Sequence, residues 1–287
     1  MRPAVTALHL YPVKSCAAVA LERGFLGPRG MESGKIGDRR WMLVDDEGVL
    51  VSQRTEPAMA RIKVTLIDGA AVRLQAEGWA PLILVPGEIE GDRGVFVMHR
   101  RQLGGYLAPA AASAWFSGVL GYRVRLIHQT DDEIRLLDPN FAPRPDTDRV
   151  GLADAYPYLL ATEATLAKLN SLLAAPVPMN RFRPNIVVGP TAADAEFGWR
   201  DLAVGEARLS LVKPCTRCVM TTIDQELGIK TGKEPLAALG RHYHLTTDLI
   251  NGAIFGENAV ATQFGCVALG DPVTILAEKP PHAFIKK

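Results

Sequence analysis

The feature that most constrains this chain is a series of short apolar stretches, each interrupted after a few residues by a turn signal. The 287 residues include 26 glycines and 20 prolines, spread along the whole sequence. Apolar runs of this length bounded by Gly, Pro, Asn or Asp are typical of strands joined by turns. The sequence therefore predicts a mainly β fold with a few helices (α+β).

Individual segments specify this expectation. The stretch "RRWMLVDDEGVLVSQR" reads as two strands around a turn at residues 45–48, and "RIKVTLIDGAAVRLQA" as a hairpin around Asp68 and Gly69. Another hairpin is expected around Gly205 and Glu206, and "APLILVPG" reads as a short buried strand. These patterns place β-structure in both halves of the chain.

A few segments indicate helices or loops instead. Residues 108–121 predict a helix that ends at Gly121, and "ATEATLAKLNSLL" predicts one behind an N-capping Thr162. "EPLAALGRH" predicts a short third helix. Residues 131–154 are polar, rich in proline and aperiodic, so we expect a long loop there. Long loops in compact domains are often functional.

Composition excludes several classes of protein. Apolar residues make up 48% and charged residues 22%, and the net charge is +1, so no broad attraction to nucleic acid or anionic membranes is indicated. The N-terminus lacks the apolar region of a signal peptide, and no apolar run is long enough to span a membrane. Four cysteines without a secretion signal fit a reducing compartment. We therefore expect a cytoplasmic protein without nucleic-acid or membrane partners.

Two of the cysteines, Cys215 and Cys218, form a C-x-x-C motif with Arg217 inside it. The motif fits a redox pair, half of a zinc site, one reactive thiolate with a bystander, or packed core. Arg217 and the nearby Lys213 would favour a thiolate at Cys218. A structural zinc site takes four ligands. The other candidate ligands are distant or form an unusual H-x-H: Cys16, Cys266, His242 and His244.

Cations and hydrogen-bond donors gather near three expected strand ends. They are Lys14 and Ser15, Arg39 and Arg40, and Arg181, Arg183 and Asn185. In a strand the last three would share one face and could line an anionic pocket, because a guanidinium binds oxyanions with two parallel hydrogen bonds. A solvated strand face with ion pairs is the alternative.

Three further polar residues stand out less. Asp154, at the end of the expected loop, would orient a water or ligand, or serve as a turn residue. His9 and His128 lie in apolar strand patterns and read as core or edge residues.

In their order along the chain, these segments resemble the MOSC-domain proteins, in particular the YcbX-like bacterial proteins and the mitochondrial amidoxime-reducing components. The resemblance rests on "YPVKSC", "GDRRWMLVD", "EPAMARI", "RFRPNIVV", "KPCTRCVMTTID" with "KEPL", and "GCVALGDPVTIL", and extends from about residue 3 to about residue 277. It implies an N-terminal β-barrel domain at residues 1–122 and a MOSC β-barrel domain at residues 123–287.

The resemblance also implies a cofactor, the molybdenum cofactor, in which a pterin with a phosphate tail holds the metal. Cys218 would be the metal ligand, with Cys215 as a packed neighbour, and Asp154 would lie near the open coordination site and act with Cys218 in catalysis. The cofactor-binding positions that carry over are Lys14, Ser15, Arg39, Arg183 and Asn185. Three more arginines match the family's pattern as well: Arg40, Arg181 and Arg217.

The implied reaction is the two-electron reduction of N-hydroxylated compounds (amidoximes, hydroxylamines and N-hydroxylated bases) to amines or amidines. Only Cys266 follows Cys218, whereas an all-cysteine iron–sulfur cluster needs four ligands. We therefore expect no such cluster in this chain and a separate ferredoxin- or flavodoxin-type electron donor. Gln225 stands where relatives often carry proline.

Two alternatives stay open. One is a carrier of molybdenum cofactor or sulfur without reductase turnover, which an absent electron-transfer domain would favour. The other is a pyridoxal-phosphate-binding protein, in which Lys14 or Lys213 would form the Schiff base.

Overall fold

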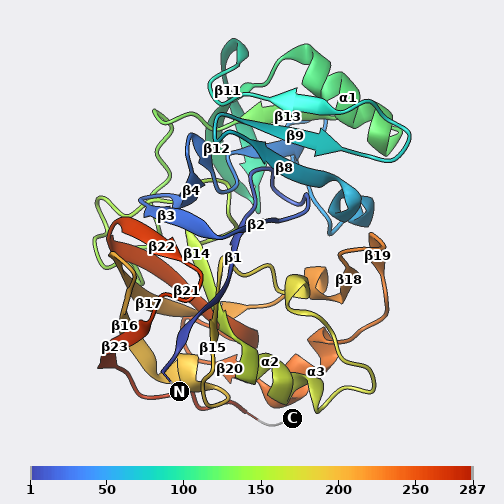
Figure 1. Cartoon of the computed structure of the whole chain (residues 1–287). Helices are drawn as coiled ribbons and strands as arrows, with labels where there is room; N and C mark the ends of the chain where they lie inside the picture. Colours follow the sequence, from blue (N-terminus) through green and yellow to red (C-terminus); the bar gives the residue numbers. More distant parts are fainter. Residues whose placement is uncertain (1, 286–287) are drawn as a thin grey trace.

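The structure, a computed structural model, describes residues 2–285 and consists mostly of β-strands with three α-helices, as predicted. Figure 1 shows an upper part, which carries strands and a helix from residues 63–128, above a lower part dominated by one large sheet. That sheet has nine strands, in the order β2 (Val19–Leu21), β1 (Ala4–Leu10), β15 (Ile186–Gly189), β14 (Tyr158–Thr162), β21 (Asn251–Gln263), β17 (Ala207–Thr216), β16 (Trp199–Val204) and β23 (Val273–Glu278), with β20 (His244–Thr246) paired to β21.

Four smaller sheets complete the β-structure. Five strands follow the order β11 (Glu90–Met98), β12 (Arg101–Leu107), β13 (Arg125–His128), β6 (Trp41–Val44) and β7 (Leu50–Val51). Four follow the order β22 (Gly265–Ala268), β3 (Arg23–Gly27), β4 (Gly30–Ser33) and β5 (Ile36–Gly37). The others are β10 (Leu82–Leu84), β9 (Ala71–Gln75) and β8 (Lys63–Ile67), and the pair β18 (Ile223–Asp224) and β19 (Ile229–Lys230).

The three α-helices lie where the sequence predicts them, at α1 (Ala110–Leu120), α2 (Glu163–Asn170) and α3 (Leu236–His242). Thr162 caps α2, since its side chain accepts a hydrogen bond from the backbone N–H of Thr165 at 3.2 Å. Gly121 ends α1 in the left-handed conformation, at φ 80°. Short 3-10 turns add η1 (Pro57–Arg61), η2 (Met179–Arg181), η3 (Ala195–Gly198) and η4 (Val219–Thr222). Within residues 2–285, no helix has the length and apolar character needed to cross a membrane.

The predicted hairpins β6–β7, β8–β9 and β16–β17 are confirmed, and residues 131–154 lie in a long connection between β13 and β14. The expectation that "APLILVPG" is a buried strand is wrong. Its strand β10 is an edge strand with Ile83 43% exposed and only Leu84 buried. A run of three apolar residues is long enough to pair with one neighbouring strand, but it does not determine whether both faces of the strand are buried.

The first and second halves of the chain share sheets. The N-terminal strand β1 pairs with β15, far along the chain, and β22 pairs with β3. Strand β13, which follows the predicted domain boundary, lies between β12 and β6 in the sheet of the upper part. The division at residues 122 and 123 stays a prediction.

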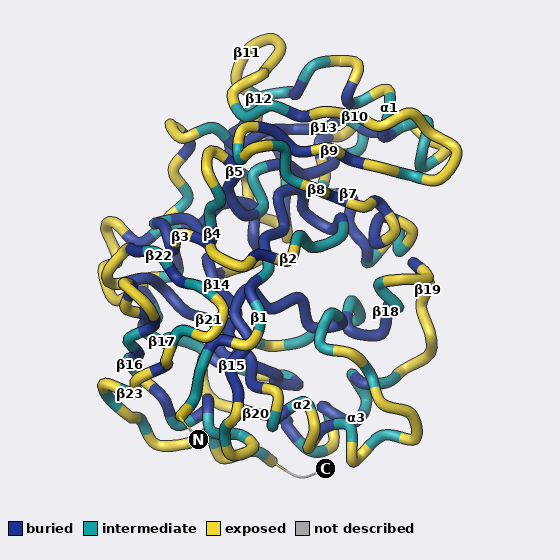
Figure 2. Tube along the Cα trace, viewed as in Figure 1, coloured by how far each residue is buried: buried dark blue, intermediate teal, exposed yellow. Residues whose placement is uncertain are grey.

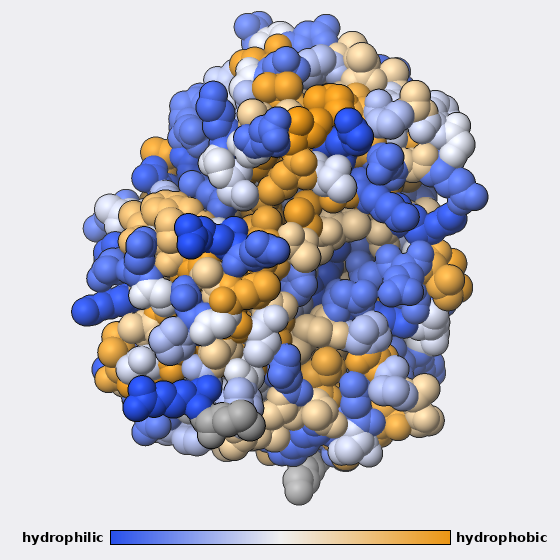
Figure 3. Space-filling view, viewed as in Figure 1, coloured by the Kyte–Doolittle hydropathy of each residue, from blue (hydrophilic) through white to orange (hydrophobic). Residues whose placement is uncertain are grey.

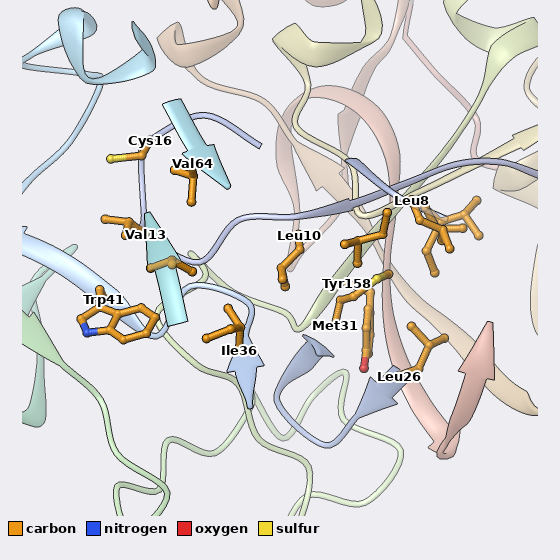
Figure 4. Close-up of a cluster of buried hydrophobic side chains, with 14 of the residues drawn as sticks. Leu8, Leu10, Val13, Cys16, Leu26, Met31, Ile36, Trp41, Val64 and Tyr158 are labelled. Carbon is orange, nitrogen blue, oxygen red and sulfur yellow. The ribbon is translucent and has the colours of Figure 1, made fainter. Parts of the chain in front are cut away.

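One hydrophobic core runs through both parts. Its buried residues extend from Val5 to Val273 and include Trp41, Val64 and Tyr158. Figure 2 shows buried segments concentrated along the strands at the centre of the molecule, and exposed segments at the loop tips. Figure 4 shows side chains of the β1 segment, among them Leu8 and Leu10, in this core. Because this core is closely packed, it holds the upper and lower parts in one relative position, and with them the loops that lie between the two parts.

Candidate functional site

A cavity of about 330 Å³ brings together residues from distant parts of the chain. Figure 3 shows hydrophilic residues in a hollow between the upper and lower parts, on the side of β18. Nine of the predicted site residues line the cavity: Lys14, Ser15, Arg39, Asp154, Arg181, Arg183, Asn185, Arg217 and Cys218. Arg40 does not. Its guanidinium turns away to the carbonyl of Gln129 and the carboxylate of Asp131.

Tyr11 packs against two of the arginines that line the cavity. The guanidinium of Arg183 lies 4.3 Å from its ring centroid and that of Arg39 lies 4.4 Å away, so two cations share one ring. The carboxylate of Asp38 contacts Arg39 and accepts hydrogen bonds from the Tyr11 backbone (2.9 Å) and the Asn185 amide (3.1 Å). Burial raises the pKa of Tyr11 to about 12, so the ring stays neutral between the two arginines.

Arg181 and Arg183 do not lie in a strand, contrary to expectation. Arg181 ends η2, Arg183 has a positive φ of 54°, and β15 begins only at Ile186. The left-handed residue redirects the chain, and it places the guanidinium in the cavity. Burial, together with the neighbouring Arg39, lowers the pKa of Arg183 to about 10.

Asn185 uses its amide inside the protein. Besides the hydrogen bond to Asp38, its NH₂ donates to the carbonyl of His9 at 3.2 Å, and its oxygen accepts from the backbone of Leu159 at 3.2 Å. The residue therefore fixes the groups around Tyr11, and its predicted contact with a cofactor stays a prediction.

The C-x-x-C motif lies at the end of β17, with Cys215 in the strand and Cys218 at the start of η4. Both are only half-buried and both line the cavity, so the packed-core alternative is wrong, as is the description of Cys215 as a packed neighbour. Cys16 is the contrasting case, since it is fully buried and burial raises its pKa to about 12. Arg217 donates from one nitrogen to the sulfur of Cys215 at 2.8 Å and from another to the carbonyl of Phe182 at 2.8 Å.

Within residues 2–285, no three or more His, Cys, Asp or Glu side chains are grouped to hold a metal ion. A structural zinc site built on the two cysteines would need further protein ligands. The site instead offers thiols beside cations. This set suits a metal centre that brings most of its own ligands and an anionic group with it.

The mouth of the cavity is organised by Asp154, whose side chain is 45% exposed. Its carboxylate contacts the ammonium of Lys14, the guanidinium of Arg54 at 2.6 Å and the imidazole of His99 at 3.1 Å. Although burial acts in the opposite direction, Lys14, His99 and Arg54 hold the pKa of Asp154 well below its usual value. Asp154 therefore stays a carboxylate, which accepts hydrogen bonds from Lys14 and Arg54 and lies within hydrogen-bond distance of the His99 imidazole.

The loop that carries Asp154 is fixed by Arg135. Its guanidinium donates to the backbone carbonyls of Gly151 (2.9 Å), Ala153 (2.6 Å) and Asp154 (2.8 Å). Lys14 also contacts this loop, since its ammonium donates to the carbonyl of Leu152 at 2.7 Å. Burial lowers the pKa of Lys14 to about 8, against the opposing effect of Asp154.

Several buried polar atoms of the lining residues have no hydrogen-bond partner among the described residues. They are Oγ of Ser15, Oη of Tyr156, Nε of Arg181, Nη2 of Arg183 and Nε of Arg217. Unsatisfied buried donors are rare in native proteins, because each costs about 1–3 kcal/mol. Three of these are guanidinium N–H groups, the groups that bind phosphate. The residues present therefore fit a bound anionic cofactor.

Backbone strain also concentrates here. Within residues 2–285, seven non-glycine residues have positive φ, and four of them line the cavity: Ser15 (71°), Arg39 (48°), His99 (50°) and Arg183 (54°). Such conformations cost about 1–3 kcal/mol each and cluster at functional sites, where the surrounding structure maintains them.

Reasoning from the sequence missed Tyr11, Arg54 and His99. Arg54 precedes the quoted "EPAMARI" segment, but nothing in the sequence shows that its side chain would reach residue 154. Other candidates lie elsewhere. The ring of His128 stacks on Trp41 with centroids 4.7 Å apart, and Lys213 lies over the ring of Phe141 rather than in the cavity lining.

Comparison with known proteins identifies the two domains of the chain and its relatives. A MOSC N-terminal beta barrel domain matches residues 2–123, and a MOSC domain matches residues 147–274. Mitochondrial amidoxime-reducing component 1 of Homo sapiens is 31% identical over 286 residues, which cover 96% of this chain and 83% of the human protein.

Two further relatives give similar values. Component 1 of Xenopus laevis is 32% identical, with 96% of this chain and 82% of that protein covered. Component 2 of Bos taurus is 29% identical, with 94% and 82% covered. The chain therefore carries a MOSC N-terminal beta barrel domain and a MOSC domain, and it belongs to the family of the mitochondrial amidoxime-reducing components.

Proposed function

We propose that this chain is a molybdenum-cofactor-dependent oxidoreductase that reduces N-hydroxylated compounds to amines or amidines with electrons from a separate donor protein. One observation carries the proposal. A half-buried thiol, Cys218, shares a cavity with arginines whose buried N–H groups have no partner in the described chain. The names of the relatives, amidoxime-reducing components, agree with the reaction class.

In this proposal Cys218 is the metal ligand, because a soft thiolate suits a sulfur-rich metal centre. Arg183, Arg217 and Ser15 donate to the anionic part of the cofactor. The cofactor, when bound, supplies the two-electron redox chemistry. The protein binds it, orients it and controls the protons around it.

The rim groups have a different role. Arg54 and Lys14 hold the carboxylate of Asp154 in place, and Arg135 fixes the loop behind it. A fixed carboxylate at the mouth can accept hydrogen bonds from the N–H groups of an amidoxime or hydroxylamine and orient its N–O bond.

Turnover of benzamidoxime tests the proposal. The protein is purified from a host that makes the molybdenum cofactor, and reduction to benzamidine is followed with a ferredoxin- or flavodoxin-type donor. We expect product formation that depends on the donor.

Two results would contradict a reductase. Cofactor release to an acceptor protein, without any benzamidine from a cofactor-loaded sample, would favour the carrier alternative. An aldimine absorbance band in the purified protein would favour the pyridoxal-phosphate alternative, with Lys14 as the lysine within the cavity.

A further inference from the structure

The hairpin formed by β11 and β12 reaches the cavity at its turn. The two residues of this turn are of types that rarely adopt its backbone conformation. Met98 pairs with Arg101, so the loop consists of His99 and Arg100 alone. Both have positive φ, 50° and 67°, as a two-residue type I′ turn requires. Asn-Gly is the favoured pair in this turn, whereas side chains such as His and Arg are strained there. The choice of residues therefore calls for a functional reason.

The contacts of the imidazole supply that reason. Its Nε2 lies 3.1 Å from the Asp154 carboxylate and 3.4 Å from Nη1 of Arg54. When Nε2 carries a proton it can donate to Asp154, and when it does not it can accept from Arg54. Each protonation state therefore finds a partner, which is what a group that gains and loses a proton in every cycle requires.

The position of the ring agrees with this role. His99 lines the cavity, yet its side chain is 37% exposed, so the same ring faces the substrate space and bulk water. The charged groups around it are the carboxylate of Asp154 and the cations Arg54 and Lys14, with Arg101 and Arg135 near the loop that carries Asp154. Lys14 and Arg54 hold Asp154 as a carboxylate, so it anchors the imidazole and does not store the proton itself.

We propose that His99 delivers protons from solvent to the substrate in the cavity, with Asp154 as its anchor and the strained turn as the device that places it. The inference rests on the proposed function. For an amidoxime, the N–O bond breaks, the oxygen leaves as water, and the amidine forms. Each turnover takes up two electrons, which the donor protein supplies by way of the cofactor, and two protons, which pass through His99.

His99→Gln is the main test, because glutamine can still donate to Asp154 but does not exchange a proton at neutral pH. We expect unchanged molybdenum per chain and a fall in kcat of about 100-fold. The pH profile of the remaining activity should differ from that of the wild type, and added imidazole should restore part of the rate. Arg100→Gln, in the same turn but outside the cavity lining, is the matched control and should keep full turnover.

The double variant His99→Asn, Arg100→Gly tests the turn without any need for cofactor. Asn-Gly suits a type I′ turn, so we expect the midpoint of thermal unfolding of the cofactor-free protein to rise while turnover falls as in His99→Gln. A lower unfolding midpoint would overturn the argument from strain.

The outcomes separate the inference from the function beneath it. If the wild-type protein turns over and His99→Gln is equally fast with the same pH profile, the proposed function stands and the role of His99 is overturned. Loss of molybdenum from His99→Gln would also overturn it, since the residue would then act in binding. Absence of turnover in the loaded wild-type protein would overturn the proposed function and this inference together.

Discussion

The interior and the mouth of the cavity both carry charged side chains, but they are built differently. In the interior, Arg183 is 7% exposed and keeps one buried N–H group without a partner among the described residues. At the mouth, Lys14, Arg54 and His99 all converge on the half-exposed Asp154, so each of these groups has a protein partner. Fixed, unsatisfied donors suit tight binding of an anion, and paired groups near water suit exchange of protons and substrate.

This contrast predicts that replacement of an interior arginine weakens cofactor binding without unfolding the protein. For Arg183→Met we expect cofactor affinity to fall about 10- to 100-fold. The free energy of unfolding of the cofactor-free protein should change by less than about 1 kcal/mol, because relief of a buried charge offsets the lost stacking on Tyr11. Molybdenum analysis and denaturant titration measure the two effects.

Arg40→Met is the matched control, since Arg40 is adjacent to a site residue but turns out of the cavity. It should keep its molybdenum. A loss of several kcal/mol in Arg183→Met would mean that this arginine is part of the structural core, and the contrast between interior and mouth would fail.

Lys14 lies at the border between the two regions, and its ionisation gives a smaller, pH-dependent effect. Its pKa is about 8 in the folded protein and 10.5 in its ordinary state. Between these values the unfolded chain binds a proton that the folded chain has released, so the free energy of unfolding rises with pH, by up to about 3 kcal/mol. Cofactor retention should fall over the same range, because the ammonium that holds Asp154 loses its charge.

The difference between wild type and Lys14→Met isolates this effect from other groups that titrate at alkaline pH. Denaturant titrations of the cofactor-free proteins between pH 7 and pH 11 provide the measurement. An equal pH dependence in both proteins would contradict the assignment of this ionisation to Lys14.

Much of the fold could be predicted from the sequence because local signals determine it. Gly121 ends a helix by adopting the left-handed conformation, Thr162 caps another, and the hairpin at Asp68 and Gly69 uses residues that tolerate positive φ. The hairpin at His99 and Arg100 was not predicted, because it lacks such a signal. Its turn contains neither glycine nor asparagine, so no local signal marks it.

The site was predictable in composition but not in geometry. Lys14 and Cys218 lie in one cavity only because β1 joins the sheet of the later strands, a long-range pairing that no local pattern shows. The resemblance to a family supplied those positions. It did not supply Arg54 or the irregular backbone that carries Arg181 and Arg183, which depend on tertiary packing. The cytoplasmic location stays a prediction.

Molybdenum per chain, measured by elemental mass spectrometry on protein from a cofactor-competent host, tests the central claim most directly. Cys218→Ser and Cys215→Ser are a matched pair, since both thiols are half-buried and line the same cavity. We predict nearly one molybdenum per chain in wild type and Cys215→Ser, and almost none in Cys218→Ser. Absence of molybdenum from the wild-type protein, or equal amounts in both variants, would contradict the assignment of Cys218 as the metal ligand.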